Sequence, residues 1–334
     1  MSGAEQTPTE LAQACQNGDR RAASRLISLI EAADAASSTK LSEALAGFAL
    51  PRQTIGITGP PGAGKSTLLD YAVSLYRARG EKVAVLAIDP SSPFTGGALL
   101  GDRIRMSSLR NDAGVFIRSM GSRGAPGGIA AAASDALRVL SAAGYPVVFL
   151  ETVGAGQTET EIINLADTVC VVQVPGLGDD VQLMKMGVLE IADIFIVNKG
   201  DKPEAVELKI QLELAIQNAT SEPGRALRQL GGPFSVSFSG ARWTPPVILL
   251  SALQRSGGEA LLDACDVHLD FLRQPGLHEA LQRSRMMREL IWRAGIKLKA
   301  RLGEALAPGG EQASIVDACA RGELTIEQAL TRLL

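Results

Sequence analysis

Seven short apolar segments alternate with longer amphipathic ones through the middle of the chain. They read QTIGIT, KVAVLAID, GVFIRS, PVVFLET, DTVCVVQV, DIFIVN and PVILLS, and several are apolar almost throughout. Short β-branched runs of this kind are typical of parallel strands that helices cover on both faces. The pattern predicts a doubly wound α/β domain with a mostly parallel sheet.

Helical patterns flank this domain on both sides. Residues 9–48 carry small and leucine positions among charged ones, which predicts two amphipathic helices separated at DAASST. From about Gly276 the strand patterns stop, and the remaining sequence predicts one long helix followed by two short ones. We expect a helical N-terminal extension over 1–50, the α/β domain over 51–275 and a helical C-terminal arm over 276–334.

Composition and charge narrow the class of protein. Of the 334 residues 46% are hydrophobic, and 33 basic against 36 acidic residues leave a formal net charge of -3. This balance gives no reason to expect nucleic acid or an anionic membrane as a partner. The four cysteines are scattered, and no apolar run approaches the ~20 residues that span a bilayer. We expect a cytoplasmic protein with reduced thiols.

A glycine-rich stretch, GPPGAGKST at residues 59–67, lies between a predicted strand and a predicted helix. In this context it is typical of a P-loop, whose backbone N–H groups surround phosphate at a helix N-terminus. We assign Lys65 to the β- and γ-phosphates and Ser66 to Mg²⁺. The other predicted phosphate contacts are Gly59, Gly62, Ala63, Gly64 and Thr67.

A second motif, FIVNKGD at residues 195–201, ends a later predicted strand. The carboxylate of Asp201 can accept hydrogen bonds from N1–H and the 2-amino group of guanine. Asn198 can bond N7, and the stem of Lys199 can pack over the ring. Because adenine offers Asp201 no matching donors, the motif predicts a preference for GTP over ATP of at least about tenfold.

The segment Ser251, Ala252 and Leu253 follows another predicted strand. The backbone N–H of Ala252 could read O6 of guanine, although Leu253 stands where other GTPases commonly carry lysine. A strand end without a ligand role is the alternative.

Three acidic residues lie near the predicted phosphates: Asp89, Asp102 and Glu151. The loop between the first two is rich in Ser, Pro, Gly and Thr, so it can order and disorder with the nucleotide state. Mg²⁺ prefers oxygen ligands from one or two carboxylates, phosphates and water. We assign Asp102 and Glu151 to Mg²⁺, the latter directly or through a water, and Asp89 to the attacking water. A helix cap or solvated turn is the alternative for each.

Glu151 and Gly154 stand where many GTPases carry Asp-x-x-Gly, so we expect the N–H of Gly154 to sense the γ-phosphate. Ala155 follows in place of the water-positioning glutamine of small signalling GTPases, and Gln157 lies two residues further on. This predicts slow intrinsic hydrolysis that a partner could stimulate ~10³-fold or more.

Several long motifs resemble those of the MeaB/ArgK family, over roughly residues 51–273. They are GPPGAGKST, IDPSSPFTGGALLGDRIRM, IRSMGSRGAPGGIA, ETVGAGQTETEI, PGLGDDVQLMKMGVLEIADIFIVNKGD and SALQRSGG, in this order. The resemblance implies a GTP-hydrolysing chaperone that binds GTP or GDP and accompanies an adenosylcobalamin-dependent acyl-CoA mutase, such as methylmalonyl-CoA mutase. Its expected role is to gate loading, protection or reactivation of that cofactor.

The same resemblance implies roles for individual residues. Asp89, Asp102 and Glu151 would serve the Mg²⁺ and hydrolysis centre. The loop GLGDDVQLMK resembles an additional switch that touches the mutase, and it contains Asp180, Gln182 and Lys185.

The predicted long C-terminal helix carries an apolar stripe bordered by arginines and lysines. Packing into a core is the usual explanation of such a stripe. Because this helix lies beyond the α/β domain, we favour a homodimer arm, which agrees with the family resemblance.

Two other functions would share the nucleotide motifs. A GTPase metallochaperone for nickel enzymes needs clustered Cys or His ligands, but His268 and His278 lie ten residues apart and no two cysteines are close in sequence. A nucleotide-gated scaffolding module would differ only in its partner, so recovery of a cobalamin mutase rather than ribosomes or membranes would distinguish the two.

Overall fold

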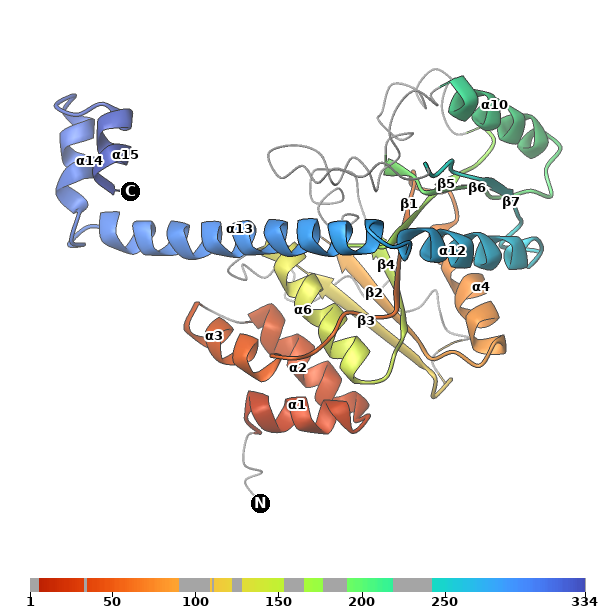
Figure 1. The fold of residues 1–334 in the computed structure, drawn as a ribbon, viewed down its shortest axis with the longest axis horizontal. Helices are drawn as coiled ribbons and strands as arrows, with labels where there is room; N and C mark the ends of the chain where they lie inside the picture. Colours follow the sequence, from red (N-terminus) through yellow and green to blue (C-terminus); the bar gives the residue numbers. More distant parts are fainter. Residues whose placement is uncertain are drawn as a thin grey trace. The chain divides into compact units, whose positions relative to one another are not determined.

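The computed structural model of the protein contains a seven-stranded sheet in the order β3-β2-β4-β1-β5-β6-β7 (Figure 1). Each neighbouring pair of these strands is parallel, which confirms the predicted doubly wound α/β fold. The strands are β1 (Gln53–Thr58), β2 (Val83–Asp89), β3 (Val115–Gly121), β4 (Val147–Thr152), β5 (Thr168–Gln173), β6 (Ile194–Val197) and β7 (Val247–Leu249). The structure describes residues 6–32, 35–89, 109, 111–121, 128–152, 165–176, 191–218 and 242–333.

Helices precede, separate and follow the strands. They are α1 (Pro8–Gln16), α2 (Arg20–Ala32), α3 (Ala35–Ala44), α4 (Lys65–Ala78), α6 (Gly128–Ala142), α10 (Glu204–Asn218), α12 (Gly258–Leu272), α13 (Leu277–Leu306), α14 (Ala313–Ala320) and α15 (Ile326–Leu333). The chain divides into two compact units, Met1–Ser284 and Arg285–Leu334. Within the described residues, no helix is long and apolar enough to span a bilayer.

In every strand except β1, alternate residues enter two different hydrophobic cores. On β2, Val83 and Val85 join a core with α4 and α12, whereas Ala84 and Leu86 join a second core with α1, α2, α6 and α10. Successive side chains of a strand point to opposite faces, so the sheet lies between two helical layers. This explains why its strands are apolar almost throughout.

The N-terminal region contains three helices where two were predicted, although α2 ends at Ala32 and α3 begins at Ala35, close to the predicted separation. The break that the prediction missed comes earlier, where Gly18 adopts φ +84° after α1. Asp19 then starts α2, because its Oδ1 accepts the N–H groups of Arg21 at 2.7 Å and Ala22 at 3.2 Å. The serines and threonine expected to interrupt the helix lie within α3. The local cap therefore outweighs the continuous apolar pattern.

The N-terminal helices share a core with the sheet. Leu26 and Ile27 of α2 are fully buried in the same cluster as residues of α6 and of the central strands. In Figure 1, α2 lies beside α6 on one side of the sheet. At the other end of the chain, one long helix followed by two short ones confirms the predicted C-terminal elements.

Leu26→Ala should lower the free energy of unfolding by about 3 kcal/mol, because it leaves a cavity in the core that α2 shares with the sheet. Urea denaturation followed by circular dichroism measures this loss. Leu29→Ala is the matched control, since Leu29 lies on the same helix but is 38% exposed, and it should cost under about 1 kcal/mol. Equal losses in the two variants would contradict a shared core.

Candidate nucleotide site

The predicted P-loop forms the connection from β1 to α4. Gly59, Gly62 and Gly64 adopt φ values of +144°, +78° and +82°, and α4 begins directly after the last of them. A Cβ on Gly64 would lie 2.7 Å from Nδ2 of Asn198, so this close approach requires glycine. The loop thus leads its backbone N–H groups to a helix N-terminus, which is the arrangement that binds phosphate.

Lys65 and Thr67 occupy the first turn of α4. The Nζ of Lys65 donates to the carbonyl oxygens of Gly59 at 2.7 Å and Pro60 at 3.2 Å. These contacts hold the ammonium group across the P-loop. Thr67 is exposed beside it.

Ser66 meets the acidic end of β4. Because Val147 and Phe149 lie in the core with α4, strand alternation directs Glu151 toward the same helix. The hydroxyl of Ser66 donates to Oε1 of Glu151 at 2.9 Å, and Glu151 is only 3% exposed. Two oxygen ligands predicted for Mg²⁺ therefore lie within hydrogen-bond distance of each other, although 85 residues separate them in the chain.

Asn198 joins the P-loop to the loop after β7. Its Nδ2 donates to the carbonyl oxygen of Ala63 at 2.9 Å, and its Oδ1 accepts the N–H groups of Lys199 at 2.8 Å and Ala252 at 3.0 Å. A carboxamide nitrogen carries two hydrogens, so one remains to offer to N7 of guanine. The N–H of Ala252, by contrast, would have to be shared between Asn198 and O6 of guanine.

Asp201 lies exposed where β6 leads toward α10. The hydroxyl of Ser251 donates to Oδ1 of Asp201 at 2.6 Å. This hydrogen bond holds the pKa of Asp201 below its ordinary value. The carboxylate therefore stays ionised as the pH falls toward that value, and it carries only acceptors, as the predicted contact with N1–H and the 2-amino group of guanine needs.

The other base-site residues surround Asp201. Lys199 is half-buried and adopts φ +60°, which is uncommon for a residue with a side chain. A Cβ on Gly200 would lie 2.9 Å from the carbonyl oxygen of Leu250, so the position that the motif leaves variable is fixed by close packing here. The sequence analysis did not predict this role for Gly200. Leu253 is 83% exposed next to this loop.

Arg255 links the loop after β7 to α4, the helix that follows the predicted P-loop. Its guanidinium carbon lies 5.1 Å from the ring centre of Tyr71, and its Nη2 donates to the hydroxyl of Ser74. Both partners belong to α4. The Arg255 backbone adopts φ +54°, and no motif in the sequence predicted this contact.

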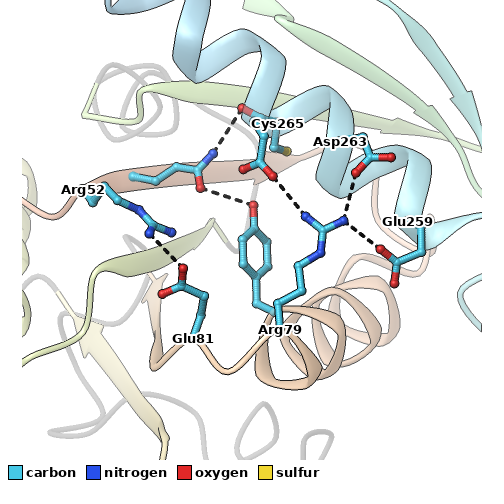
Figure 2. A network of polar contacts seen from close by, with 9 residues as sticks. Arg52, Arg79, Glu81, Glu259, Asp263 and Cys265 are labelled. Carbon is cyan, nitrogen blue, oxygen red and sulfur yellow. Dashed lines mark hydrogen bonds and ion pairs between the residues drawn. The ribbon is translucent and has the colours of Figure 1, made fainter.

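A polar network fixes the far end of α4 against α12 (Figure 2). Arg79 donates to Glu259 at 2.8 Å, to Asp263 at 2.9 Å and to Asp266 at 3.0 Å. The hydroxyl of Tyr76 donates to Gln53 on β1 at 3.3 Å. The helix that carries Ser66 is thus anchored away from the site as well as within it.

Several predicted site residues fall at or beyond the limits of the described structure. Asp89 is the last residue of β2, so only its backbone position is known. The remaining ones lie outside the described residues, and they are Asp102, Gly154, Asp180, Gln182 and Lys185.

The two histidines lie apart from the nucleotide motifs. His268 is fully buried, with Nδ1 2.9 Å from the hydroxyl of Thr168, and His278 contacts Gln282. Over the part of the chain that the structure describes, no three His, Cys, Asp or Glu side chains gather as metal ligands. These residues therefore lend no support to the metallochaperone alternative.

A comparison with protein families matches residues 23–305 to the model described as "Methylmalonyl Co-A mutase-associated GTPase MeaB". The chain belongs to the MeaB family. It is accordingly a GTPase of the group associated with methylmalonyl-CoA mutase, as the resemblance of its motifs predicted.

Relatives of this MeaB-family GTPase cover most of its length. A Pyrococcus abyssi protein, named as an inferred GTPase, is 46% identical over 84% of this chain and 82% of its own. GTPase ArgK of Escherichia coli is 34% identical over 86% of this chain and 83% of its own. A crystal structure titled LAO/AO transport system kinase has a TM-score of 0.65 at 26% identity, covering 100% of this chain and 98% of that one.

Gly64→Ala should weaken GDP binding at least about tenfold, because a methyl group would displace Asn198 from its contact with the P-loop. Isothermal titration calorimetry with GDP measures this affinity. Gly80→Ala is the matched control: Gly80 follows the other end of α4 at φ +85°, with no atom within 4 Å of an added Cβ. It should cost about 1 kcal/mol of stability without changing the affinity. If Gly64→Ala binds GDP as tightly as the wild type, the contact between Asn198 and the P-loop is not needed for nucleotide binding.

Proposed function

We propose that the protein is a GTP-hydrolysing chaperone that gates adenosylcobalamin loading, protection or reactivation of an acyl-CoA mutase such as methylmalonyl-CoA mutase. The observation that carries the nucleotide part of this proposal is the contact between Ser66 and Glu151. It joins α4 to the acidic end of β4, so a ligand held by Ser66 would also affect the position of Glu151.

Mg²⁺ fits the oxygen ligands at this contact. A serine hydroxyl and a nearly buried carboxylate 2.9 Å apart are the kinds of ligand that Mg²⁺ takes beside phosphate oxygens. We propose that Ser66 and Glu151 hold the ion together with Asp102. When bound, Mg²⁺ would neutralise charge that develops on the transferred phosphoryl group.

The remaining predicted site residues have separate proposed roles in nucleotide binding and hydrolysis. Lys65 would contact the β- and γ-phosphates, and Asn198 with Asp201 would select guanine. Asp89 would orient the attacking water, and Gly154 would sense the γ-phosphate. Because a glutamine is missing after Gly154, intrinsic hydrolysis should be slow until a partner completes the site.

The family description supports a mutase as that partner, since it names association with methylmalonyl-CoA mutase. We propose that the segment with Asp180, Gln182 and Lys185 contacts the mutase and relays the nucleotide state. Hydrolysis would then time the transfer of the cofactor.

Glu151→Gln should keep guanine-nucleotide binding but slow GTP hydrolysis about 100-fold, because the Mg²⁺ ligand loses its charge. In the presence of apo methylmalonyl-CoA mutase, adenosylcobalamin transfer should slow together with hydrolysis in this variant, because hydrolysis times the transfer. Single-turnover assays with radiolabelled GTP and the absorbance change of the bound cofactor give the two readouts.

Glu81→Gln serves as the control for that variant, because Glu81 pairs with Arg52 in the network of Figure 2 rather than at the nucleotide site. It should behave as the wild type in both assays. If wild-type protein hydrolyses GTP but neither binds the mutase nor changes cofactor transfer, the chaperone function is refuted while the GTPase activity stands.

We also propose that the C-terminal arm forms a homodimer. In the second unit, Met286, Leu290, Ile291 and Leu298 of α13 are between 44% and 62% exposed. Apolar side chains repeated along one helix are a common basis of association between helices.

Leu290→Glu should therefore convert the dimer into a monomer without lowering the melting temperature of the α/β unit. A glutamate at an exposed site costs little in an isolated chain but is costly inside an apolar interface. Light scattering coupled to size exclusion measures the mass. Glu304→Gln on the same helix is the control and should stay dimeric. A Leu290→Glu variant that also stays dimeric would contradict dimerisation through the C-terminal arm.

A further inference from the structure

The motif IRSMG places a charged residue inside an otherwise apolar strand. Arg118 lies on β3, between Phe116 and Met120, which belong to the core that the sheet shares with α2 and α6. Residues at this spacing share one face of a strand. The guanidinium of Arg118 is therefore directed toward that helical layer rather than toward the nucleotide.

Glu31 of α2 receives this guanidinium. Its Oε2 pairs with Nη2 of Arg118, and the hydroxyls of Ser24 and Ser28 accept further hydrogen bonds from the same side chain at 3.3 Å and 2.9 Å. The side chains of Arg118 and Glu31 are 14% and 3% exposed. Charges this well buried bind strongly when paired, and each is costly if the other is removed.

The second oxygen of Glu31 reaches the end of the strand. Its Oε1 accepts the N–H of Gly121 at 3.2 Å. Gly121 is the register partner of Asp89, the last residue of β2. On the other side of β2, Ala87 pairs with Glu151. One buried carboxylate on the N-terminal helix thus holds the strand end next to two predicted hydrolytic residues.

We propose that Glu31 is a positioning residue for GTP hydrolysis. By holding Arg118 and Gly121, it fixes the ends of β3 and β2 and thereby the place from which Asp89 serves the attacking water. The inference rests on the role proposed above for Asp89. It assigns the N-terminal helices a part in the reaction, and it gives the IRSMG motif a physical purpose.

Arg20 supplies a matched control, because it makes the corresponding link at the start of the same strand. Its guanidinium donates to the carbonyl oxygens of Ala113 at 3.2 Å and Val115 at 2.6 Å. The phosphate-binding loop and Glu151 lie at the other ends of the strands. Loss of this contact should loosen α2 from β3 without moving the hydrolytic residues.

The test measures intrinsic single-turnover GTP hydrolysis and GDP affinity in the full chain, without a mutase, so failure of the chaperone function does not affect it. Glu31→Gln should slow hydrolysis about tenfold and leave the dissociation constant of GDP within about twofold, since a small displacement of a reacting group lowers the rate more than binding. Arg20→Gln should hydrolyse at the wild-type rate. If Glu31→Gln does not fold, Glu31→Asp is the substitute, because it keeps a charge opposite Arg118. It should likewise slow hydrolysis and leave the dissociation constant of GDP nearly unchanged.

A double-mutant cycle with Asp89→Asn separates positioning from a general loss of stability. Because both residues act on one step, Glu31→Gln combined with Asp89→Asn should be no slower than Asp89→Asn alone. Additive losses would overturn the proposal. So would a wild-type rate in folded Glu31→Gln or Glu31→Asp, a wild-type rate in Asp89→Asn, or an equal loss of hydrolysis in Arg20→Gln.

Discussion

The side chain of Asn198 makes the contacts on which the arrangement of the candidate nucleotide site depends. It is 3% exposed, and it bonds the carbonyl oxygen of Ala63 in the P-loop and the N–H of Ala252 in the loop after β7. Three segments distant in sequence are thereby held at one edge of the sheet. Buried carboxamides are costly unless their polar atoms are paired, so this residue favours one arrangement of the three loops. Gly64 is part of the same constraint, because only a residue without a Cβ lets Asn198 approach.

Much of the fold followed from local patterns. Each of the seven strands was expected from a short apolar run, and the P-loop was expected from glycines placed between a strand and a helix. The strands and the glycine turn between β1 and α4 are confirmed, because strand burial and positive φ angles both impose residue types at fixed positions. The error in the N-terminal helices had a local cause, since Gly18 and Asp19 form a stop and a cap inside an amphipathic pattern that otherwise continues.

The contacts across the site were harder to predict. Ser66 and Glu151 were each assigned to Mg²⁺ from their motifs, but their distance depends on which face of β4 carries the glutamate. The pairing of Glu31 with Arg118 joins residues 87 positions apart, and no spacing rule connects them. The motif leaves the position of Gly200 variable, because motifs record the ligand groups and not the packing between them. Side-chain geometry of this kind depends on the whole fold.

The contact of Arg255 with Tyr71 has a consequence for the lifetime of a bound nucleotide. Together with Asn198 it completes a ring that runs from the P-loop along α4, across to the loop after β7 and back to the P-loop. If one of these two contacts breaks, the other still limits how far the loop after β7 can move from the P-loop and α4. We therefore expect departure of a guanine nucleotide to require both contacts to loosen together, because loss of one leaves the other to limit the movement of the loops.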